Sequence, residues 1–156
     1  MQSSGGRRIK RALVLKAKSV HYLKDEQIEA LKKIELISDY LTQRQKDITS
    51  YNDTHNVDKS TLINGRNMTN LGVFRKYLLS YIQNHSAINK DMSIMVRQLE
   101  PTPHGLPLEI YAFSSDKRWE NYEYIMSDIF DHAISAVPYF ELELFEYPTD
   151  FPKFTT

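Results

Sequence analysis

The sequence predicts an α+β domain of the ferredoxin-like split β-α-β type (βαββαβ), with four antiparallel strands and helices on one face. Apolar residues alternate with polar ones in four short segments, which is typical of strands with one buried face. Between these segments lie two stretches with helical spacing of apolar residues. The βαββαβ order emerges once a helical insertion after the first strand, at about residues 24–66, is set aside. The 156 residues, of which 41% are hydrophobic, supply enough apolar material for one such domain.

The first strand is predicted at residues 9–17, where Leu13 and Leu15 alternate with basic or small residues. Asp25 and Glu26 follow at positions where negative charge favours the start of a helix. Two short apolar stripes that meet near Leu36 predict two helical pieces for the insertion. Its end, residues 52–70, is rich in Asn, Asp, Ser and Thr and is predicted to be a polar loop.

The next three elements are predicted from apolar spacing. A helix is expected to bury Leu71, Phe74, Leu78, Tyr81 and Ile82. Two strands are expected after it, the first with Met92, Ile94 and Val96 on one side and the second with Leu106, Leu108, Ile110 and Ala112. The segment 101–105, with two prolines and a glycine, separates them as a loop.

A long helix and a last strand complete the prediction. The helix is expected to have Asp116 as its N-cap and to end before Pro138. Its buried face is expected to consist of Trp119, Tyr122, Met126, Ile129, Phe130, Ala133 and Val137. On this basis Trp119→Ala should destabilise the fold by about 3–5 kcal/mol. The last strand is predicted from alternation of Phe140, Leu142 and Leu144 with Glu141, Glu143 and Phe145.

Composition excludes several classes of protein. The chain has no cysteine, so it has neither disulfides nor thiolate metal sites. No stretch approaches the ~18 apolar residues that would cross a bilayer, so the chain itself is not expected to insert into a membrane. The net charge is zero, but it is unevenly spread: seven basic residues and no acidic one occur through Lys24, and eleven acidic residues against two basic ones occur from Glu100 to Asp150.

A search for catalytic motifs predicts no enzyme. The five histidines do not form a His-Glu-x-x-His pair, and neither a Gly-x-Ser-x-Gly motif nor a phosphate-binding glycine loop occurs. Gly72 is interpreted as a small residue in the first turn of a helix. Asp128 and His132 lie one helical turn apart, where a surface charge pair is commoner than an acid/base or metal site. We therefore assign no catalytic, cofactor-binding or metal-binding residues from the sequence.

Tyr111 and Phe113 should project from the same face of a strand. Sheet-face aromatic residues bind bases in RNA-recognition domains of the same topology. However, the motif of those domains is missing and the adjoining chain is acidic, so nucleic acid is not an expected partner. Burial of the two rings in a subunit interface is the preferred interpretation.

Five stretches resemble a known family when they are taken in order. They are residues 5–11 (GGRRIKR), 68–75 (MTNLGVFR), 95–101 (MVRQLEP), 105–113 (GLPLEIYAF) and 128–132 (DIFDH). Together they resemble the mechanosensitive channel of small conductance (MscS) family, in particular its YbdG-like, miniconductance branch. The resemblance covers roughly residues 5–147.

The resemblance implies that this is the C-terminal cytoplasmic domain of a bacterial inner-membrane channel. In the family, a small β-domain and a transmembrane pore precede this domain, residues 1–8 correspond to the junction with the β-domain, and the subunits form a homoheptamer around a hollow vestibule. Tension opens the pore under hypo-osmotic shock and releases ions and small solutes. The isolated chain is expected to be a monomer or a weak oligomer, because the pore and β-domain are missing. Two prolines in the tail, residues 148–156, argue against the shared barrel of the smallest members.

A second interpretation keeps the same scaffold but assigns another role. A ferredoxin-like domain can also act as a regulatory module that binds a small molecule. This role requires a pocket with convergent polar groups at a junction between elements.

Overall fold

Three strands pair into an antiparallel sheet in the order β1-β3-β2. The computed structural model describes residues 6–147, in which β1 spans Arg8–Leu15, β2 Met95–Gln98 and β3 Leu106–Phe113. The pairing of β1 with β3 runs over the whole of both strands, from Arg8 opposite Phe113 to Leu15 opposite Leu106. The order of strands and helices confirms a mixed α+β fold, and the alternation of apolar residues found in the sequence sets the register.

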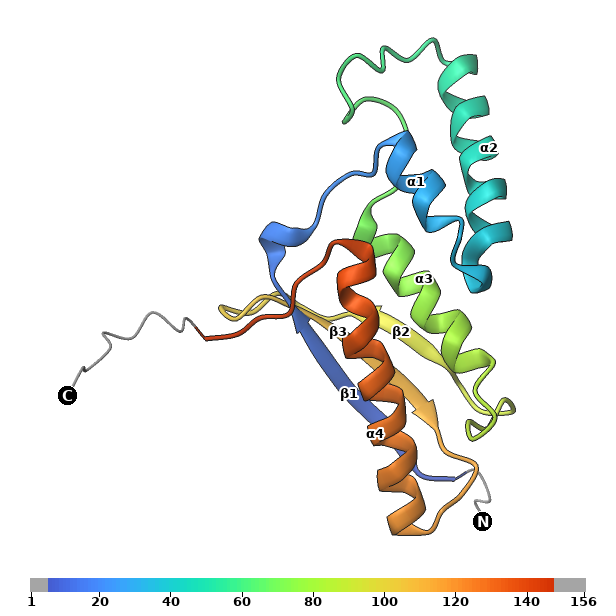
Figure 1. The fold of residues 1–156 in the computed structure, drawn as a ribbon, viewed down its shortest axis with the longest axis vertical. Helices are drawn as coiled ribbons and strands as arrows, with labels where there is room; N and C mark the ends of the chain where they lie inside the picture. Colours follow the sequence, from blue (N-terminus) through green and yellow to red (C-terminus); the bar gives the residue numbers. More distant parts are fainter. Residues whose placement is uncertain (1–5, 148–156) are drawn as a thin grey trace, which may run out of the picture.

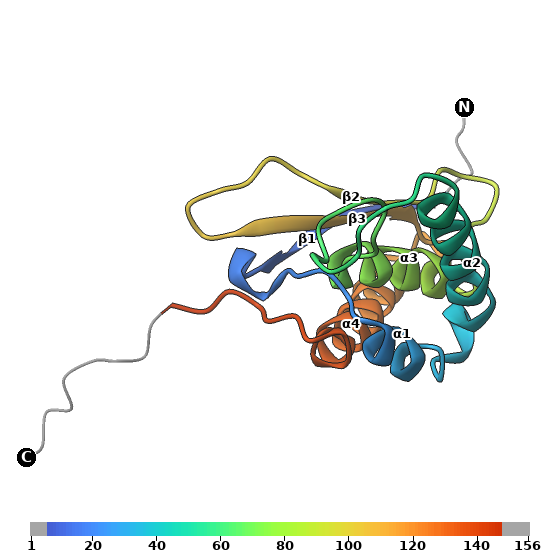
Figure 2. The same ribbon diagram turned by 90° about the horizontal axis from the view of Figure 1, so that it is seen from above.

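Two long helices cover one side of this sheet (Figure 2). α3 spans Asn70–Gln83 and lies beside β2, and α4 spans Trp119–Ala136. Figure 1 shows both helices in front of the sheet. The core between the two layers contains Ile9, Leu13 and Leu15 of β1, Leu108, Ile110 and Ala112 of β3, Phe74, Leu78 and Ile82 of α3, and Ile129 and Ala133 of α4. The sequence patterns predicted all of these residues except Ile9, whereas Tyr81, also expected to be buried on α3, is only partly buried.

The other side of the sheet carries the alternate residues of each strand. Figure 2 shows no described helix on that side. Its side chains are Arg8 and Lys10 of β1, Met95 and Arg97 of β2, and Glu109, Tyr111 and Phe113 of β3. We call this set the sheet face.

The insertion forms a separate pair of helices at one end of the sheet layer (Figure 1). α1 spans Asp25–Leu31, a short 3-10 helix η2 spans Glu35–Ile37, and α2 spans Ser38–Thr54. The predicted break near Leu36 is confirmed, because η2 lies there. The polar segment after α2 contains no helix or strand up to α3, as expected, although α2 extends two residues past Asn52.

The fourth strand expected at residues 140–145 is reduced to a single bridge. Leu144 pairs with Leu15 in antiparallel fashion, and the Phe145 N–H donates to the Val14 carbonyl at 2.8 Å. The chain turns in a 3-10 helix, η3 (Val137–Phe140), and Glu141 then has a left-handed φ of 58°. Phe140 therefore packs with the helices, with its ring 5.1 Å from that of Phe74, and does not pair in the sheet. Ile94 likewise precedes β2, which begins only at Met95.

Two predictions for α4 need correction at its N-terminal end. Trp119 was predicted to be buried but is 62% exposed, because the sheet ends at Arg8 and Phe113 and nothing described covers the first turn of α4. The cap residue is Arg118 and not Asp116. Asp116 instead accepts the Arg118 N–H at 2.9 Å, and side-chain hydrogen bonds from Arg118 and Asn121 hold its pKa well below the usual range.

Residues 1–5 and 148–156 lie outside the described part of the chain. The interpretations of the N-terminal junction and of the C-terminal tail fall wholly or mainly on these residues.

Candidate functional site

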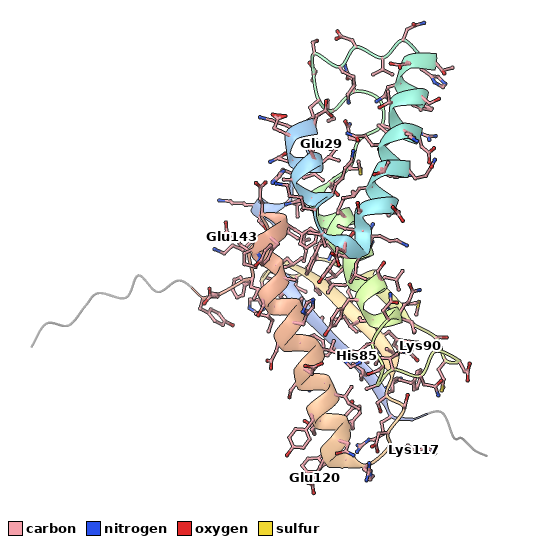
Figure 3. The ribbon with its side chains drawn as sticks, turned by 45° about the vertical axis from the view of Figure 1, so that its right-hand side comes forward. Glu29, His85, Lys90, Lys117, Glu120 and Glu143 are labelled. Carbon is pink, nitrogen blue, oxygen red and sulfur yellow. The ribbon has the colours of Figure 1, made fainter. Side chains whose placement is uncertain are left out.

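A stripe of polar aromatic side chains on α3 faces α4. Tyr77 and Tyr81 lie one turn apart, and His85 follows a further turn on, just after the helix. Opposite them, α4 presents Asp128 and His132. Figure 3 shows His85 near the end of α3, on the side toward α4. The two helices thus bring five polar groups together in what we call the Tyr-His cluster.

The contacts inside the Tyr-His cluster are close and directional. The Tyr77 hydroxyl lies 2.6 Å from Nε2 of His132, and the rings of Tyr81 and His132 stack at 3.9 Å with an 8° angle between their planes. His85 Nε2 lies 2.9 Å from the Asp128 carboxylate. Asp128 and His132, which lie one turn apart in the sequence, therefore contact different partners, His85 just after α3 and Tyr77 on α3.

Burial determines the protonation of this cluster. Desolvation lowers the pKa of His132 below its usual 6.5, the nearby Asp128 carboxylate opposes this shift, and His85 adds to it. Desolvation also raises the pKa of the Tyr77 and Tyr81 phenols. At neutral pH His132 is therefore a neutral imidazole, and Tyr77 and Tyr81 are protonated phenols.

A mostly apolar pocket of about 350 Å³ adjoins the Tyr-His cluster. Tyr77 and His132 form its polar wall together with Ser135. The rest of the lining is Ile34, Ala136, Tyr139 and Phe140. Four segments therefore meet at the pocket: α3, α4, η3 and the short link before η2.

The chemistry that this site offers is hydrogen bonding and stacking. Tyr77, Tyr81 and His85 were not among the residues considered functional from the sequence, and Ser135 was not either. Their four-residue spacing, 77-81-85, is the signal that places them on one face at α3. In the described range 6–147, no three His, Asp or Glu side chains lie close enough together to hold a metal ion.

The sheet face is the second surface of interest. The Tyr111 and Phe113 rings lie on it as predicted, edge to face at 5.7 Å. Glu109 is buried there and accepts from Arg97 Nε at 2.9 Å. Lys10 and Arg8 stand directly opposite Tyr111 and Phe113. The surroundings of the aromatic pair are therefore basic, although the chain next to them in sequence is acidic.

The remaining histidines lie apart from the Tyr-His cluster. His21 pairs with Glu141 at 3.0 Å, and His55 stacks on Tyr51 at 4.0 Å. His104 is exposed beside the ring of Phe145. Gly72 lies in the first turn of α3, as predicted, and donates its N–H to the Thr69 hydroxyl.

No protein-family model matches this chain. None of the helices in the described range is both long and apolar enough to cross a membrane.

Proposed function

We propose that this chain is the cytoplasmic α/β domain of a bacterial mechanosensitive channel of the small-conductance type. Membrane tension during hypo-osmotic shock opens the pore of such a channel. In this proposal the domain forms part of the vestibule wall below the inner membrane and serves as an assembly scaffold. Its role requires shape and contact surfaces and no catalysis.

One observation carries the proposal. The five stretches that resemble the family lie, in order, on the elements that build the sheet and its two covering helices. They fall at the start of β1, at the start of α3, on β2, on β3 and in α4. Gly6, in the first stretch, has φ of 98°, and a Cβ there would lie 1.5 Å from the Ser114 carbonyl oxygen. That stretch thus needs its glycine where the chain reaches the sheet.

We further propose that the fold is a ferredoxin-like sheet whose fourth strand is shortened to the segment around Leu144. This segment lies beside β1, which gives the spatial order fourth-first-third-second. Two ladder bonds support it, from Lys16 N–H to the Glu143 carbonyl and from Phe145 N–H to the Val14 carbonyl, both 2.8 Å long. Slow hydrogen exchange at these two amides is expected. Exchange as fast as at the amides of the exposed polar segment between α2 and α3 would contradict a fourth strand.

The channel proposal is tested on the full-length gene. We expect the coding sequence upstream of Met1 to encode several apolar segments of about 20 residues. Expression in a bacterium that lacks its own tension-gated channels should restore survival of osmotic downshock and give tension-activated currents in membrane patches. A coding sequence without such segments, or patches without current despite membrane insertion, would refute the proposal.

Two matched variants separate the role of this domain from that of the pore. Ile110→Asp places a charge in the core between sheet and helices, where Ile110 has no exposed surface. It should abolish rescue. Lys46→Asp, on the exposed side of α2, should leave rescue intact. Rescue by both variants would mean that the channel does not need this domain.

The pocket beside the Tyr-His cluster favours a second candidate function, regulation by a small molecule. Its volume lies in the range of ligand sites, and its apolar lining carries three convergent polar groups. This chemistry suits a small planar aromatic compound with one hydrogen-bonding group. Indole is a suitable probe. It should raise the melting temperature of the wild type but not of Ser135→Trp, which fills the pocket, whereas Ser127→Trp, on the same helix outside the pocket, should still respond.

A further inference from the structure

Two faces of opposite charge lie on opposite sides of the domain. The sheet face carries Arg8, Lys10 and Arg97 against the single carboxylate of Glu109, so its formal charge is positive. Its centre is the ring pair of Tyr111 and Phe113, which is only partly covered. Met95, at 43% exposure, extends this apolar area. Such a surface is unusual for a protein that acts as a monomer.

The outer side of α4 is the opposite in charge. α4 contains four acidic residues and neither Lys nor Arg. At intervals of three and four residues, its exposed side presents Glu120, Tyr124, Ser127, Asp131 and Ile134. We call this stripe the α4 face. Tyr124 is 70% exposed, and Figure 3 shows Glu120 near the free end of the helix.

We propose that the sheet face of one copy of this chain docks onto the α4 face of a second copy. This inference rests on the proposed function, because it specifies how neighbouring domains in the assembly meet. Lys10 and Arg8 then lie against Glu120 and Asp131, and aromatic surface is covered on both copies. Because the two faces lie on opposite sides of the sheet-helix layer (Figure 2), the contact is head to tail. Contacts of this kind generate rings or open chains, not closed pairs.

Nucleic acid is the rival occupant of the sheet face, since aromatic rings beside basic residues also suit unpaired bases. Two observations favour a second copy. The carboxylate of Glu109 in the middle of the sheet face already pairs with Arg97, so this guanidinium is engaged and is not available to a phosphate. In addition, the complementary acidic surface is present on the same chain, whose net charge is zero.

The test uses two charge-reversal variants and their mixture. The sheet-face variant is Arg8→Glu with Lys10→Glu, and the α4-face variant is Glu120→Lys with Asp131→Lys. By analytical ultracentrifugation at low salt, the wild type should associate weakly and concentration-dependently, and high salt should weaken this association. The association constant of each variant alone should be lower than that of the wild type by about tenfold or more. An equimolar mixture should regain association, because the intact sheet face of one variant meets the intact α4 face of the other, and the two reversed faces are again complementary in charge.

The control reverses charge away from both faces, with Arg44→Glu and Lys46→Glu on α2, and should associate like the wild type. Circular dichroism establishes that each variant is folded. Disulfide cross-linking tests the contact without reversing any charge, and it is possible because the chain has no native cysteine. A mixture of Met95→Cys and Tyr124→Cys chains should form mixed disulfide dimers in excess over dimers of either chain with itself.

Three results would overturn the docking. They are a wild type that stays monomeric at low salt up to about millimolar concentration, a mixture no more associated than its components, and tight binding of oligouridylate that Arg8→Glu with Lys10→Glu abolishes. The last result would assign the sheet face to nucleic acid. If the full-length protein conducts normally with both reversal variants, the docking fails while the channel assignment stands.

Discussion

Asn70 illustrates what a single buried amide does in this fold. Its side chain has no exposed surface, its oxygen accepts the His21 N–H at 2.9 Å, and its nitrogen donates to the carbonyls of Ser19 and Phe140, also at 2.9 Å. It thereby joins the link after β1, the start of α3 and the end of η3. Sequence patterns did not identify this role, because an Asn at the start of a helix is ordinarily exposed or a cap.

Replacing Asn70 should be costly. Asn70→Ala removes the partner of two backbone N–H groups, those of His21 and Leu71, and of the Ser19 and Phe140 carbonyls in a closed site. We therefore expect a loss of about 2–4 kcal/mol in the free energy of unfolding. Urea denaturation measures it. The matched control is Asn84→Ala, an exposed asparagine that donates to its own helix at the Ser80 carbonyl, with an expected loss of about 0.5 kcal/mol. Equal losses in the two variants would mean that the Asn70 network contributes little.

The candidate site was only partly predictable at this scale. Asp128 and His132 were recognised by their spacing on one helix, which local sequence reveals. Their actual partners, Tyr77 and His85, are 55 and 43 positions away in sequence, and their approach depends on how α3 packs beside α4. Local periodicity contains no information on that packing.

The lowered pKa of His132 predicts a specific pH dependence. Its folded pKa lies below the unfolded value of 6.5, so the unfolded chain binds the proton more readily. The stability due to neutral His132 is complete above pH 6.5, falls as the pH drops from there toward the folded pKa, and is constant below it. We expect the stability advantage of the wild type over His132→Gln to shrink as the pH falls below about 6.5. Parallel curves of stability against pH would contradict a neutral, desolvated His132.

At the scale of elements, helical periodicity located both covering helices, but it did not show where their cover ends. Met126 and Ile129 face the sheet as predicted, whereas Trp119 continues the same stripe past the end of the sheet. Periodicity gives the direction of a side chain and not what lies in front of it. The prediction of a strand at residues 140–145 was mostly wrong for a related reason. The alternation through Phe140 and Leu142 is typical of a strand, but Phe140 packs in the helix layer instead.

A pair of substitutions in α4 tests this distinction. Ile129→Ala, at a site without exposed surface, should lower the free energy of unfolding by about 2–5 kcal/mol. Trp119→Ala, although it removes a larger side chain, should change it by only about 0.5 kcal/mol. Denaturant melts of both variants decide the matter. A large loss for Trp119→Ala would restore the original prediction of a buried face that reaches the first turn.

At the scale of the whole molecule, the chain divides into a sheet layer with two helices and an insertion that leaves and rejoins it at adjacent points. Tyr22 bridges Thr69, and the Leu23 N–H donates to the Met68 carbonyl at 2.8 Å. The sequence order alone indicated this division, since removal of residues 24–66 left a complete βαββαβ pattern. Sequence did not show how much the insertion contributes to the core.

That contribution can be measured by deletion. Because residues 23 and 68 are hydrogen-bonded neighbours, a turn of about four residues can replace residues 24–67 without stretching the chain. The shortened chain should still fold cooperatively, since β1, β3, α3 and α4 keep their mutual contacts. It should be less stable by at least the ~2–5 kcal/mol that emptying one large core site costs, because Ile37 and Leu41 are fully buried and would be lost.

Circular dichroism with urea denaturation measures both the cooperativity and the stability of the shortened chain. A cooperative transition at lower urea would confirm the insertion as an addition to a self-sufficient layer. Loss of the transition would show instead that α1 and α2 are required parts of one core, and that the ferredoxin-like pattern does not fold alone.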